Sequence, residues 1–262
     1  MQQRTIGIMG AMPEEVNSLI GLMENTAEHT IGMRTYTVGK INGIKTIIVF
    51  SRWGKVAAAT TVSTLILNFH VTEIIFTGVA GAINDNLNIG DVVLAKRLVQ
   101  HDMDARPLMP KFEIPLLQKT FFECNDEQLA IASTAIHQIL ENKQLHEMIG
   151  DEQLKQFSIQ QPKLMIGDIA SGDQFFSSSA DKEKLLEQLP SVLCVEMEGA
   201  AVAQVCYEYD VPFTIIRTIS DIADEHAPID FPSFINNVSS KYSLEIVRNI
   251  YVQLQTGLYK NP

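Results

Sequence analysis

The sequence is poor in cysteine, in positive charge and in long apolar runs. Its three cysteines show no CxxC spacing, which disfavours a disulfide framework or a zinc site and favours buried thiols in a reducing compartment. No stretch approaches the roughly 20 apolar residues that cross a bilayer, because Glu196 and Glu198 interrupt the apolar run over 192–206. We therefore predict no membrane contact.

Charge and the first residues narrow the class of protein further. The formal net charge at pH 7 is -11, whereas nucleic acids are bound largely by neutralising their phosphates with lysine and arginine. The first residues lack a basic segment followed by a long apolar one, so no secretory signal is predicted. These features predict a cytoplasmic protein that binds a small neutral or cationic ligand and no nucleic acid.

Strand and helix patterns alternate along the chain. Residues 5–9 form the apolar run of a buried strand, and Pro13 suits the first turn of a helix. Residues 34–40 and 44–50 are rich in β-branched and aromatic residues and flank Asn42-Gly43, a signal for a two-residue hairpin turn. Further strands are predicted at 73–76, 91–99, 163–173, 192–195 and 213–219, and helices at 56–69, 126–141, 182–189, 197–209 and 234–254.

This alternation predicts an α/β fold with a central mixed β-sheet flanked by helices. No internal repeat or Pro/Gly/Ser-rich break divides the 262 residues, so we expect a single domain over 1–262. A hydrophobic content of 46% is enough to fill a substantial core. The composition turns polar around 141–161, which predicts a helical surface extension rather than a linker.

Acidic residues follow three of the predicted strands, at the edge of the sheet where α/β proteins bind ligands. They are Glu15, the pair Glu196 and Glu198, and Asp221. Glu198 lies among apolar and small residues, where burial of a charge without a function is costly. Asp221 is equally compatible with a helix N-cap. The pattern makes these carboxylates candidates for binding or catalysis.

Six short segments occur in an order that spans nearly the whole chain. They are 6–16, 54–59, 77–81, 171–175, 195–198 and 217–221, which read IGIMGAMPEEV, GKVAAA, TGVAG, SGDQF, VEME and RTISD. Together they resemble 5'-methylthioadenosine/S-adenosylhomocysteine nucleosidase. The resemblance implies a nucleoside phosphorylase-like fold and hydrolysis of the N-glycosidic bond of 5'-modified adenine nucleosides, without a cofactor or metal. Its candidate substrates are methylthioadenosine, S-adenosylhomocysteine, 5'-deoxyadenosine and aminodeoxyfutalosine, which the sequence does not rank.

The resemblance also implies catalytic roles. Hydrolysis of such a bond needs a protonated leaving purine and a positioned water at a ribosyl centre that becomes cationic. The first task falls to Asp221, which would protonate adenine at N7 with support from Ser220. The second falls to Glu15, which would activate the water that Arg217 helps to hold. Arg217 is also compatible with a structural ion pair.

The remaining implied roles concern the ribose and the base. Glu198 corresponds to the acceptor of hydrogen bonds from the ribose hydroxyls, and Met197 would lie against the sugar. Phe175 corresponds to the ring that stacks on adenine, and the backbone of Phe176 to the position that reads the base edge. Outside the Ser-Gly-Asp context both phenylalanines would be interpreted as core. Two residues would line the sugar and 5'-substituent region: Trp53 and Met12, the latter also compatible with core filling.

Several positions depart from the family. Val79 stands where members commonly have a serine, so a hydroxyl near the ribose or the water is missing. Water positioning would then depend more on Glu15 and Arg217. Arg52-Trp53 replaces a glycine followed by an aliphatic residue, which predicts a narrower pocket or an altered preference for the 5'-substituent.

The segment over 101–110 keeps the family's His-Asp-x-Asp start but continues differently. In the family this region reaches the 5' pocket of the neighbouring subunit in a homodimer, so the resemblance implies a homodimer here. The candidates for this cross-subunit contact are Leu108, Pro110 and Ile114. An apolar contact there would suit a thioether tail.

A nucleoside phosphorylase of the same fold is the nearest alternative function. Phosphate requires cationic or dipolar contacts. The first strand-to-helix turn carries Glu14 and Glu15 rather than arginine, and no arginine occurs over 73–81. Two carboxylates near the nucleophile should repel a phosphate dianion, so hydrolysis is favoured.

Two further alternatives belong to other classes. A metalloenzyme would use ligands of an acceptable type whose spacing matches no strong motif: His101, Asp102, Asp104, Asp224 and His226. A noncatalytic nucleoside-binding protein would keep the pocket without turnover. The joint presence of Glu15, Glu198 and Asp221 argues against it, because binding alone needs no residue that activates water.

Overall fold

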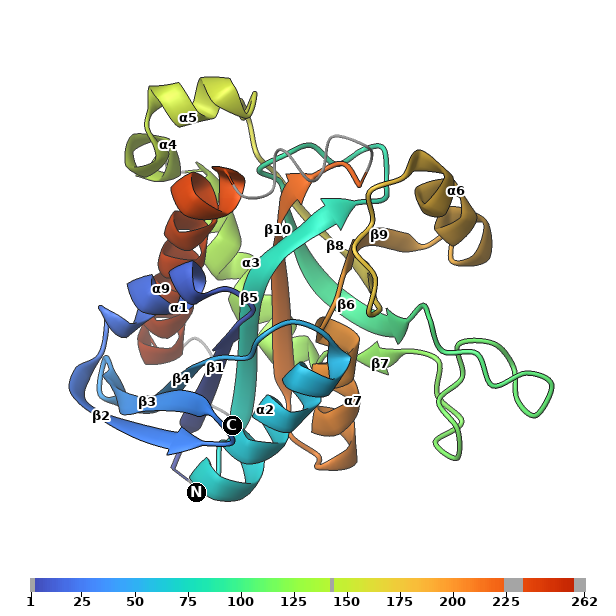
Figure 1. Cartoon of the computed structure of the whole chain (residues 1–262). Helices are drawn as coiled ribbons and strands as arrows, with labels where there is room; N and C mark the ends of the chain where they lie inside the picture. The colour runs from blue at the N-terminus through green and yellow to red at the C-terminus, as the bar shows by residue number, and fades with distance from the viewer. Residues whose placement is uncertain (1–2, 142–143, 224–232, 257–262) are drawn as a thin grey trace.

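One mixed β-sheet runs through the middle of the molecule, with helices on both sides (Figure 1). The computed structural model describes residues 3–141, 144–223 and 233–256. The strands are β1 (Thr5–Gly10), β2 (Glu24–Ile31), β3 (Arg34–Ile41), β4 (Ile44–Phe50), β5 (Glu73–Ala82), β6 (Val92–Gln100), β7 (Phe122–Glu123), β8 (Leu164–Ser171), β9 (Val192–Glu196) and β10 (Phe213–Asp221). Their order is β10-β6-β8-β9-β5-β1-β4-β3-β2, and β7 pairs with β6. The predicted α/β fold with a central mixed sheet is confirmed.

An additional pairing between β10 and β5 closes part of the sheet into a ring. β5 pairs with β10, β10 with β6, β6 with β8, β8 with β9, and β9 again with β5. β9 runs antiparallel to β5, and Val195 lies opposite Gly81. Asp221, the last residue of β10, is also paired with Gly81. The carboxyl ends of β5, β9 and β10 therefore converge at one place.

The first strands follow the sequence patterns closely. β1 is buried along its whole length, as its apolar run predicts. Asn42 and Gly43 have φ angles of 48° and 79°, in the left-handed region that a two-residue hairpin turn requires. Ile41 and Ile44 pair across this turn, so the predicted hairpin between β3 and β4 is confirmed.

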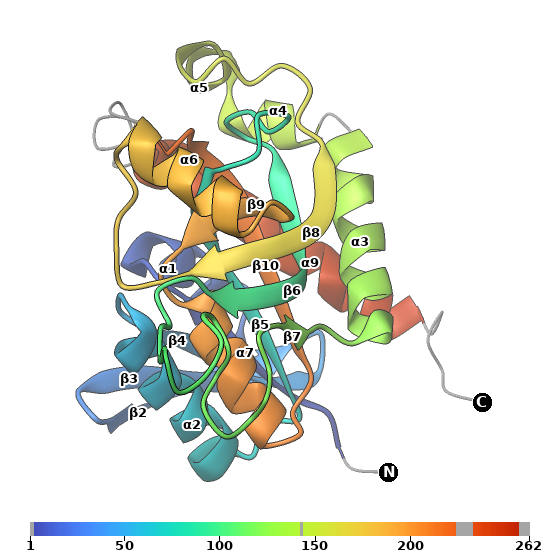
Figure 2. The same ribbon diagram turned by 90° about the vertical axis from the view of Figure 1, so that its right-hand side faces the viewer.

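The helices form two groups on opposite sides of the sheet. They are α1 (Pro13–Ile20), α2 (Lys55–Phe69), α3 (Asp126–Glu141), α4 (Gln144–Ile149), α5 (Asp151–Gln156), α6 (Ser179–Gln188), α7 (Gly199–Glu208), the π-helical turn η1 (Ile235–Ser239) and α9 (Ser240–Thr256). α2 packs against α7 on one side, and α9 packs against α1 and α3 on the other (Figures 1 and 2). The predicted helices are confirmed, with ends that shift by a few residues.

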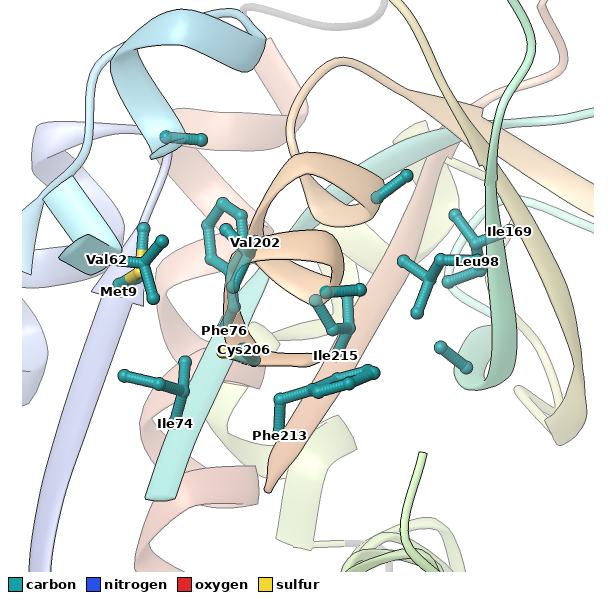
Figure 3. Close-up of a cluster of buried hydrophobic side chains, with 14 of the residues drawn as sticks. Met9, Val62, Ile74, Phe76, Leu98, Ile169, Val202, Cys206, Phe213 and Ile215 are labelled. Carbon is teal, nitrogen blue, oxygen red and sulfur yellow. The ribbon is translucent and has the colours of Figure 1, made fainter. Parts of the chain in front are cut away.

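Alternating side chains of the central strands divide the core into two layers, because successive strand residues point to opposite faces. On one face Phe76 of β5 packs in a cluster with Val62 of α2 and Val202 of α7 (Figure 3). On the other face Ile75 belongs to a cluster that includes Ile246 of α9. Both faces of β5 are thus covered, which holds its glycine-rich end in place.

Three segments differ from the sequence-based expectations. β2 is an exposed strand at the outer edge of the sheet that was not predicted, since its residues show no apolar alternation. β5 continues past Phe76, the last residue of the predicted strand, to Ala82. The polar extension consists of the two short helices α4 and α5, which are separated at Gly150.

Two further predictions concern the cysteine thiols and membrane-spanning helices. The three cysteines are free, and Cys194 and Cys206 are buried, as predicted. Among residues 3–141, 144–223 and 233–256, no helix is long and apolar enough to cross a membrane.

Replacing Leu65 of α2 with alanine should lower the free energy of unfolding by about 2–5 kcal/mol, because its fully buried side chain would leave a cavity. Urea unfolding followed by circular dichroism measures the change. Leu67 lies on the exposed side of the same helix, so Leu67→Ala is the matched control and should cost less than about 0.5 kcal/mol. Equal losses in the two variants would contradict the orientation of α2.

Candidate active site

The converging ends of β5, β9 and β10 surround a pocket of about 350 Å³. Its walls are completed by the start of α1, the segment before α2 and the loop after β8. It is lined by Ala11, Met12, Trp53, Val79, Ala80, Gly81, Gln174, Phe175, Phe176, Val195, Glu196, Met197, Glu198, Ser220 and Asp221. These include most of the predicted site residues, which come from six separate parts of the chain.

Asp221 is the last residue of β10 rather than the N-cap of a helix. Its side chain is buried at the edge of the pocket. Oδ2 accepts a hydrogen bond from Ser220 Oγ at 2.8 Å, and Oδ1 accepts one from the Ala223 amide at 2.9 Å. A Cβ at Gly81 would lie 2.8 Å from Oδ1 and 3.1 Å from the Ala223 Cβ, so a larger residue here would displace this carboxyl group. Asp221 is therefore held in one orientation at the pocket.

Glu15 lies in the first turn of α1 and is completely buried, behind the residues that line the pocket. Oε2 accepts hydrogen bonds from the Ala11 and Met12 amides, each at 3.1 Å, and Oε1 accepts one from Ser239 Oγ at 3.0 Å. Burial raises the pKa of Glu15 to about 7, although the Ser239 hydrogen bond and the charge of Arg217 oppose this shift. Glu15 can therefore exchange a proton near neutral pH.

Arg217 forms a buried ion pair with Glu196. Arg217 Nη2 and Nε lie 2.7 and 3.2 Å from Glu196 Oε2, and Nη1 donates to the carbonyl oxygens of Phe76 and Ile216. The guanidinium also lies over the Phe76 ring, 4.2 Å from its centroid. The structural ion pair that the sequence left open is thus present. The predicted role of Arg217 in holding water stays a prediction.

Glu196 is satisfied by several donors besides Arg217. It accepts hydrogen bonds from the Gly199 amide at 2.8 and 2.9 Å, from the Glu198 amide at 3.2 Å and from Ser171 Oγ. The sequence analysis assigned it no role of its own, because nothing in the sequence shows which arginine it meets. Glu196 and Glu198 both line the pocket, but Glu198 has a different hydrogen-bond partner.

Glu198 Oε1 accepts a hydrogen bond from the Gly54 amide at 2.7 Å. Burial and then the negative charge of Glu196 raise the pKa of Glu198 to about 8, against the Gly54 hydrogen bond and the charge of Arg217. A group that can be either neutral or ionised near neutral pH can accept hydrogen bonds from hydroxyl groups in both states. This suits contact with the hydroxyls of a sugar.

Two phenylalanines from the loop after β8 form an aromatic wall. Phe175 is 43% exposed, whereas Phe176 is 7% exposed and packs edge-to-face against His101, with ring centroids 5.2 Å apart. At the opening of the pocket Trp53 is 60% exposed, and its Nε1 donates to Met12 Sδ at 3.1 Å. Val79 and Met197 complete the apolar lining, so a flat heterocycle and an apolar tail both find suitable surfaces.

The predicted cross-subunit residues lie outside the pocket, in the segment between β6 and β7. This segment projects from the side of the molecule in Figure 1 and faces the viewer in Figure 2. Leu108 and Pro110 are exposed. Ile114 is buried in the chain's own core, with its backbone bridged to Lys119, so its side chain offers no surface to a second subunit.

Three of the alternative metal ligands, His101, Asp102 and Asp104, lie in the part of the chain that the structure describes. Across the described residues, no group of three or more His, Cys, Asp and Glu side chains is arranged to hold a metal ion. Asp102 instead pairs with Lys55, and Asp104 with Arg106. Asp224 and His226 lie outside the described residues.

The family model of the phosphorylase superfamily matches residues 5–250. A curated relative from Actinobacillus succinogenes, a 5'-methylthioadenosine/S-adenosylhomocysteine nucleosidase, is 34% identical over 251 residues, which cover 95% of this chain and 99% of the relative. The chain belongs to this nucleosidase family.

Solved structures agree with this assignment. The S-adenosylhomocysteine nucleosidase of Streptococcus pyogenes, in complex with 5-methylthiotubericidin, superposes with a TM-score of 0.83 at 32% identity, covering 97% of this chain and 98% of that one. The futalosine hydrolase of Helicobacter pylori superposes with a TM-score of 0.80, also at 32% identity, covering 95% and 98%. The predicted nucleoside phosphorylase-like fold is therefore confirmed.

Replacing Arg217 with methionine should lower the free energy of unfolding by about 3–5 kcal/mol, because Glu196 would stay buried without its cationic partner. Urea unfolding measures this loss. Arg106→Met is the control: both members of its ion pair with Asp104 are exposed, with 60% and 36% of their side chains accessible, so its removal should change the free energy of unfolding far less. An Arg217→Met variant as stable as the unmodified protein would show that the pair does not hold the ring of strands together.

Proposed function

We propose that this protein hydrolyses the N-glycosidic bond of 5'-modified adenine nucleosides and releases adenine and the 5'-modified ribose. The observation that carries the proposal is the grouping of three buried carboxyl groups at one pocket: Asp221 and Glu198 in its wall and Glu15 behind it. The names of the relatives and of the solved structures support the same reaction.

The base end of the reaction is assigned to Asp221. With Phe175 and Phe176 enclosing adenine, its carboxyl group would donate a proton to N7 and make the purine a better leaving group. Ser220 Oγ donates to Asp221 Oδ2 at 2.8 Å and the Ala223 amide donates to Oδ1 at 2.9 Å, so both oxygens are held in place. The carboxyl group is thereby pre-oriented before substrate binds.

The sugar end is assigned to the two glutamates. Glu198 would accept hydrogen bonds from the ribose hydroxyls, and its negative charge stabilises the ribosyl cation that develops as the bond breaks. Glu15 would take a proton from a water that attacks the anomeric carbon. This role is supported because Glu15 Oε1 lies close to β5 where that strand lines the pocket. A Cβ added at Gly78, the residue before the pocket-lining Val79, would lie only 3.5 Å from this oxygen.

The charges at the pocket favour water over phosphate as the nucleophile. The charged residues that line it are Glu196, Glu198 and Asp221, all acidic. Arg217, whose positive charge lowers the pKa of Glu198, is already paired with Glu196. A phosphate dianion would meet uncompensated negative charge, so a phosphorylase is the weaker alternative. A binding protein without turnover would have no use for Glu15.

We further propose a cytoplasmic homodimer that acts in methionine salvage and needs no cofactor. Leu108 and Pro110 would reach the 5' pocket of the neighbouring subunit, because they are exposed on a projecting segment. The apolar surfaces of Met12, Trp53 and Val79 suit a thioether tail. Methylthioadenosine, S-adenosylhomocysteine, 5'-deoxyadenosine and aminodeoxyfutalosine are the candidate substrates.

Adenine should be released from at least one of these four nucleosides in phosphate-free buffer containing a metal chelator. Chromatography of the reaction products measures it. Release that depends on added phosphate would identify a phosphorylase instead, and release that needs a divalent ion would identify a metalloenzyme. Absence of turnover with intact binding would identify a binding protein.

Glu15→Gln and Asp221→Asn should each lower kcat by about 10²–10⁴-fold, because each removes one proton transfer. The affinity for adenine should change little in Glu15→Gln, since Glu15 lies behind the pocket wall. Glu14→Gln, the same substitution one residue earlier in α1, is the matched control and should keep full activity. A fully active Glu15→Gln variant would show that another group activates the water.

The acid limb of the pH profile should reflect Glu15. Its pKa is raised to about 7, and only the ionised carboxylate can accept a proton from water, so kcat/KM should rise with pH through about 7. Ionisation of Glu198, whose pKa is about 8, should extend this rise. Initial rates of adenine release between pH 5 and 9 measure this. Glu14→Gln should keep the same limb, and a profile that is flat across this range would contradict the assignment.

Stability gives an independent check on the same group. The folded chain holds the Glu15 proton at a higher pH than an unfolded chain, whose glutamate titrates near 4.5. Ionising Glu15 therefore costs stability as the pH rises from about 4.5 through 7. The free energy of unfolding of Glu15→Gln minus that of the unmodified protein should therefore be larger at pH 8 than at pH 5. A pH-independent difference would contradict the raised pKa.

A further inference from the structure

Three separate segments meet at the start of α2 through charged and amide groups. Lys55 Nζ lies 2.6 Å from Asp102 Oδ1, just after β6, and also donates to Gln100 Oε1 at 3.1 Å. Asp102 Oδ2 accepts a hydrogen bond at 3.0 Å from the amide of Asp173, just after β8. Asp173 Oδ1 in turn accepts one at 2.8 Å from the Lys55 amide. Lys55, Asp102 and Asp173 thus contact one another in a closed ring of three residues.

Each segment in this ring continues into the pocket. The residue before Lys55 is Gly54, whose amide donates to Glu198 Oε1 at 2.7 Å. The residues after Asp173 lead to Phe175 and Phe176, which form the aromatic wall. The ring therefore connects the support of the sugar-facing carboxyl group with the loop that encloses the base.

The backbone conformation of Gly54 allows its close contacts with Glu198 and Asp173. Gly54 has φ = +88°, which directs its amide toward Glu198, and a Cβ at this position would lie 3.0 Å from Asp173 Oδ1. Partial burial works to raise the pKa of Asp102, but the hydrogen bonds from Lys55 and the Asp173 amide hold it below the usual value. Asp102 is consequently ionised at neutral pH, and its pairing with the Lys55 ammonium persists there.

The side chain of Lys55 is mostly shielded, with 17% of its surface exposed. Partly buried ion pairs are screened less by salt than fully exposed ones and restrict the elements that they join. The loop after β8 has no regular structure between Ser171 and α6. Its first residue, Gly172, is held by a hydrogen bond from its amide to the Glu196 carbonyl oxygen at 3.1 Å and lies against His101. At the next residue, Asp173, the contacts with Asp102 and Lys55 fix the loop.

We propose that Lys55 is a positioning residue that, through Asp102 and Asp173, fixes the base-enclosing loop relative to Glu198, so that one nucleoside can contact both. This inference rests on the proposed function of the pocket, but it concerns residues that do not line it. Removing the Lys55 ammonium should therefore weaken the binding of base and nucleoside. The rate of the chemical step should change little, because bond breaking still uses Asp221 and Glu15.

Lys55→Met tests the proposal by removing the ammonium while keeping most of the aliphatic stem. The KM for methylthioadenosine and the Kd for adenine should each rise about tenfold, with kcat changed by less than about threefold. Lys55→Arg keeps the charge and should stay within about threefold of the unmodified protein in both constants. Adenine binding can be followed through Trp53, the one tryptophan in the chain, which lines the pocket.

The matched control is Lys182→Met. Lys182 has 18% of its side chain exposed, close to the 17% of Lys55, and pairs at 3.1 Å with the exposed Asp85, so the substitution removes a similarly shielded lysine outside the ring. Its KM and Kd should equal those of the unmodified protein. Asp102→Ala should reproduce the effect of Lys55→Met, and the double variant should be no worse than the weaker-binding single variant, because both act through one interaction.

The outcomes separate failure of this inference from failure of the proposed function. If the unmodified protein neither releases adenine nor changes its Trp53 fluorescence when adenine is added, the proposed function fails. If it does both, but Lys55→Met and Asp102→Ala match it in KM and Kd, the positioning role is wrong. An equal rise in KM for Lys182→Met would also overturn it. Should Lys55→Met fail to fold, as judged by circular dichroism, Asp102→Ala and Lys55→Arg decide the question.

Discussion

The buried ion pair between Arg217 and Glu196 is the interaction on which the pocket depends. It joins β10 to the end of β9 across the ring of strands. Removing two charges from water is costly unless their remaining hydrogen-bonding groups are satisfied, and here backbone amides, Ser171 and two carbonyl oxygens satisfy them. Because the pair is fixed, it also sets the local field: Arg217 favours ionisation of Glu15 and Glu198, while Glu196 opposes it in Glu198.

That field distinguishes carboxyl groups that the sequence presents as equivalent. Glu15 is enclosed and receives hydrogen bonds at both oxygens, Glu198 shares the pocket wall with a negative neighbour, and Asp221 is held by Ser220 and the following turn. Similar groups in different surroundings can serve as acid, base and electrostatic stabiliser within one site. The division of tasks proposed for this pocket follows from position rather than from residue type.

Structural features that depend on residues close together in the chain could be predicted from the sequence. Contacts between residues far apart in the chain could not. Apolar runs, the Asn42-Gly43 turn and the acidic residues after strands are local signals, and they located most of the fold and most of the pocket lining. The hydrogen bond between Ser239 and Glu15 joins residues 224 positions apart. The partnership of Arg217 with Glu196 and the second pairing of β5 likewise arise only when the ring closes. No periodicity encodes such contacts, and the polar strand β2 escaped prediction because it has no buried face.

The polarity of β2 also bears on how molecules of this protein meet. β2 ends the sheet, and its sequence, ENTAEHTI, presents carboxylates and hydroxyls along nearly its whole exposed length. An edge of this kind resists pairing with a strand from another chain, which protects against aggregation through sheet extension. The register with β3 also shifts between Glu24 and Ala27, and this bulge interrupts the edge further. Self-association by edge-to-edge pairing is thus disfavoured, and contacts between copies are left to helices and loops.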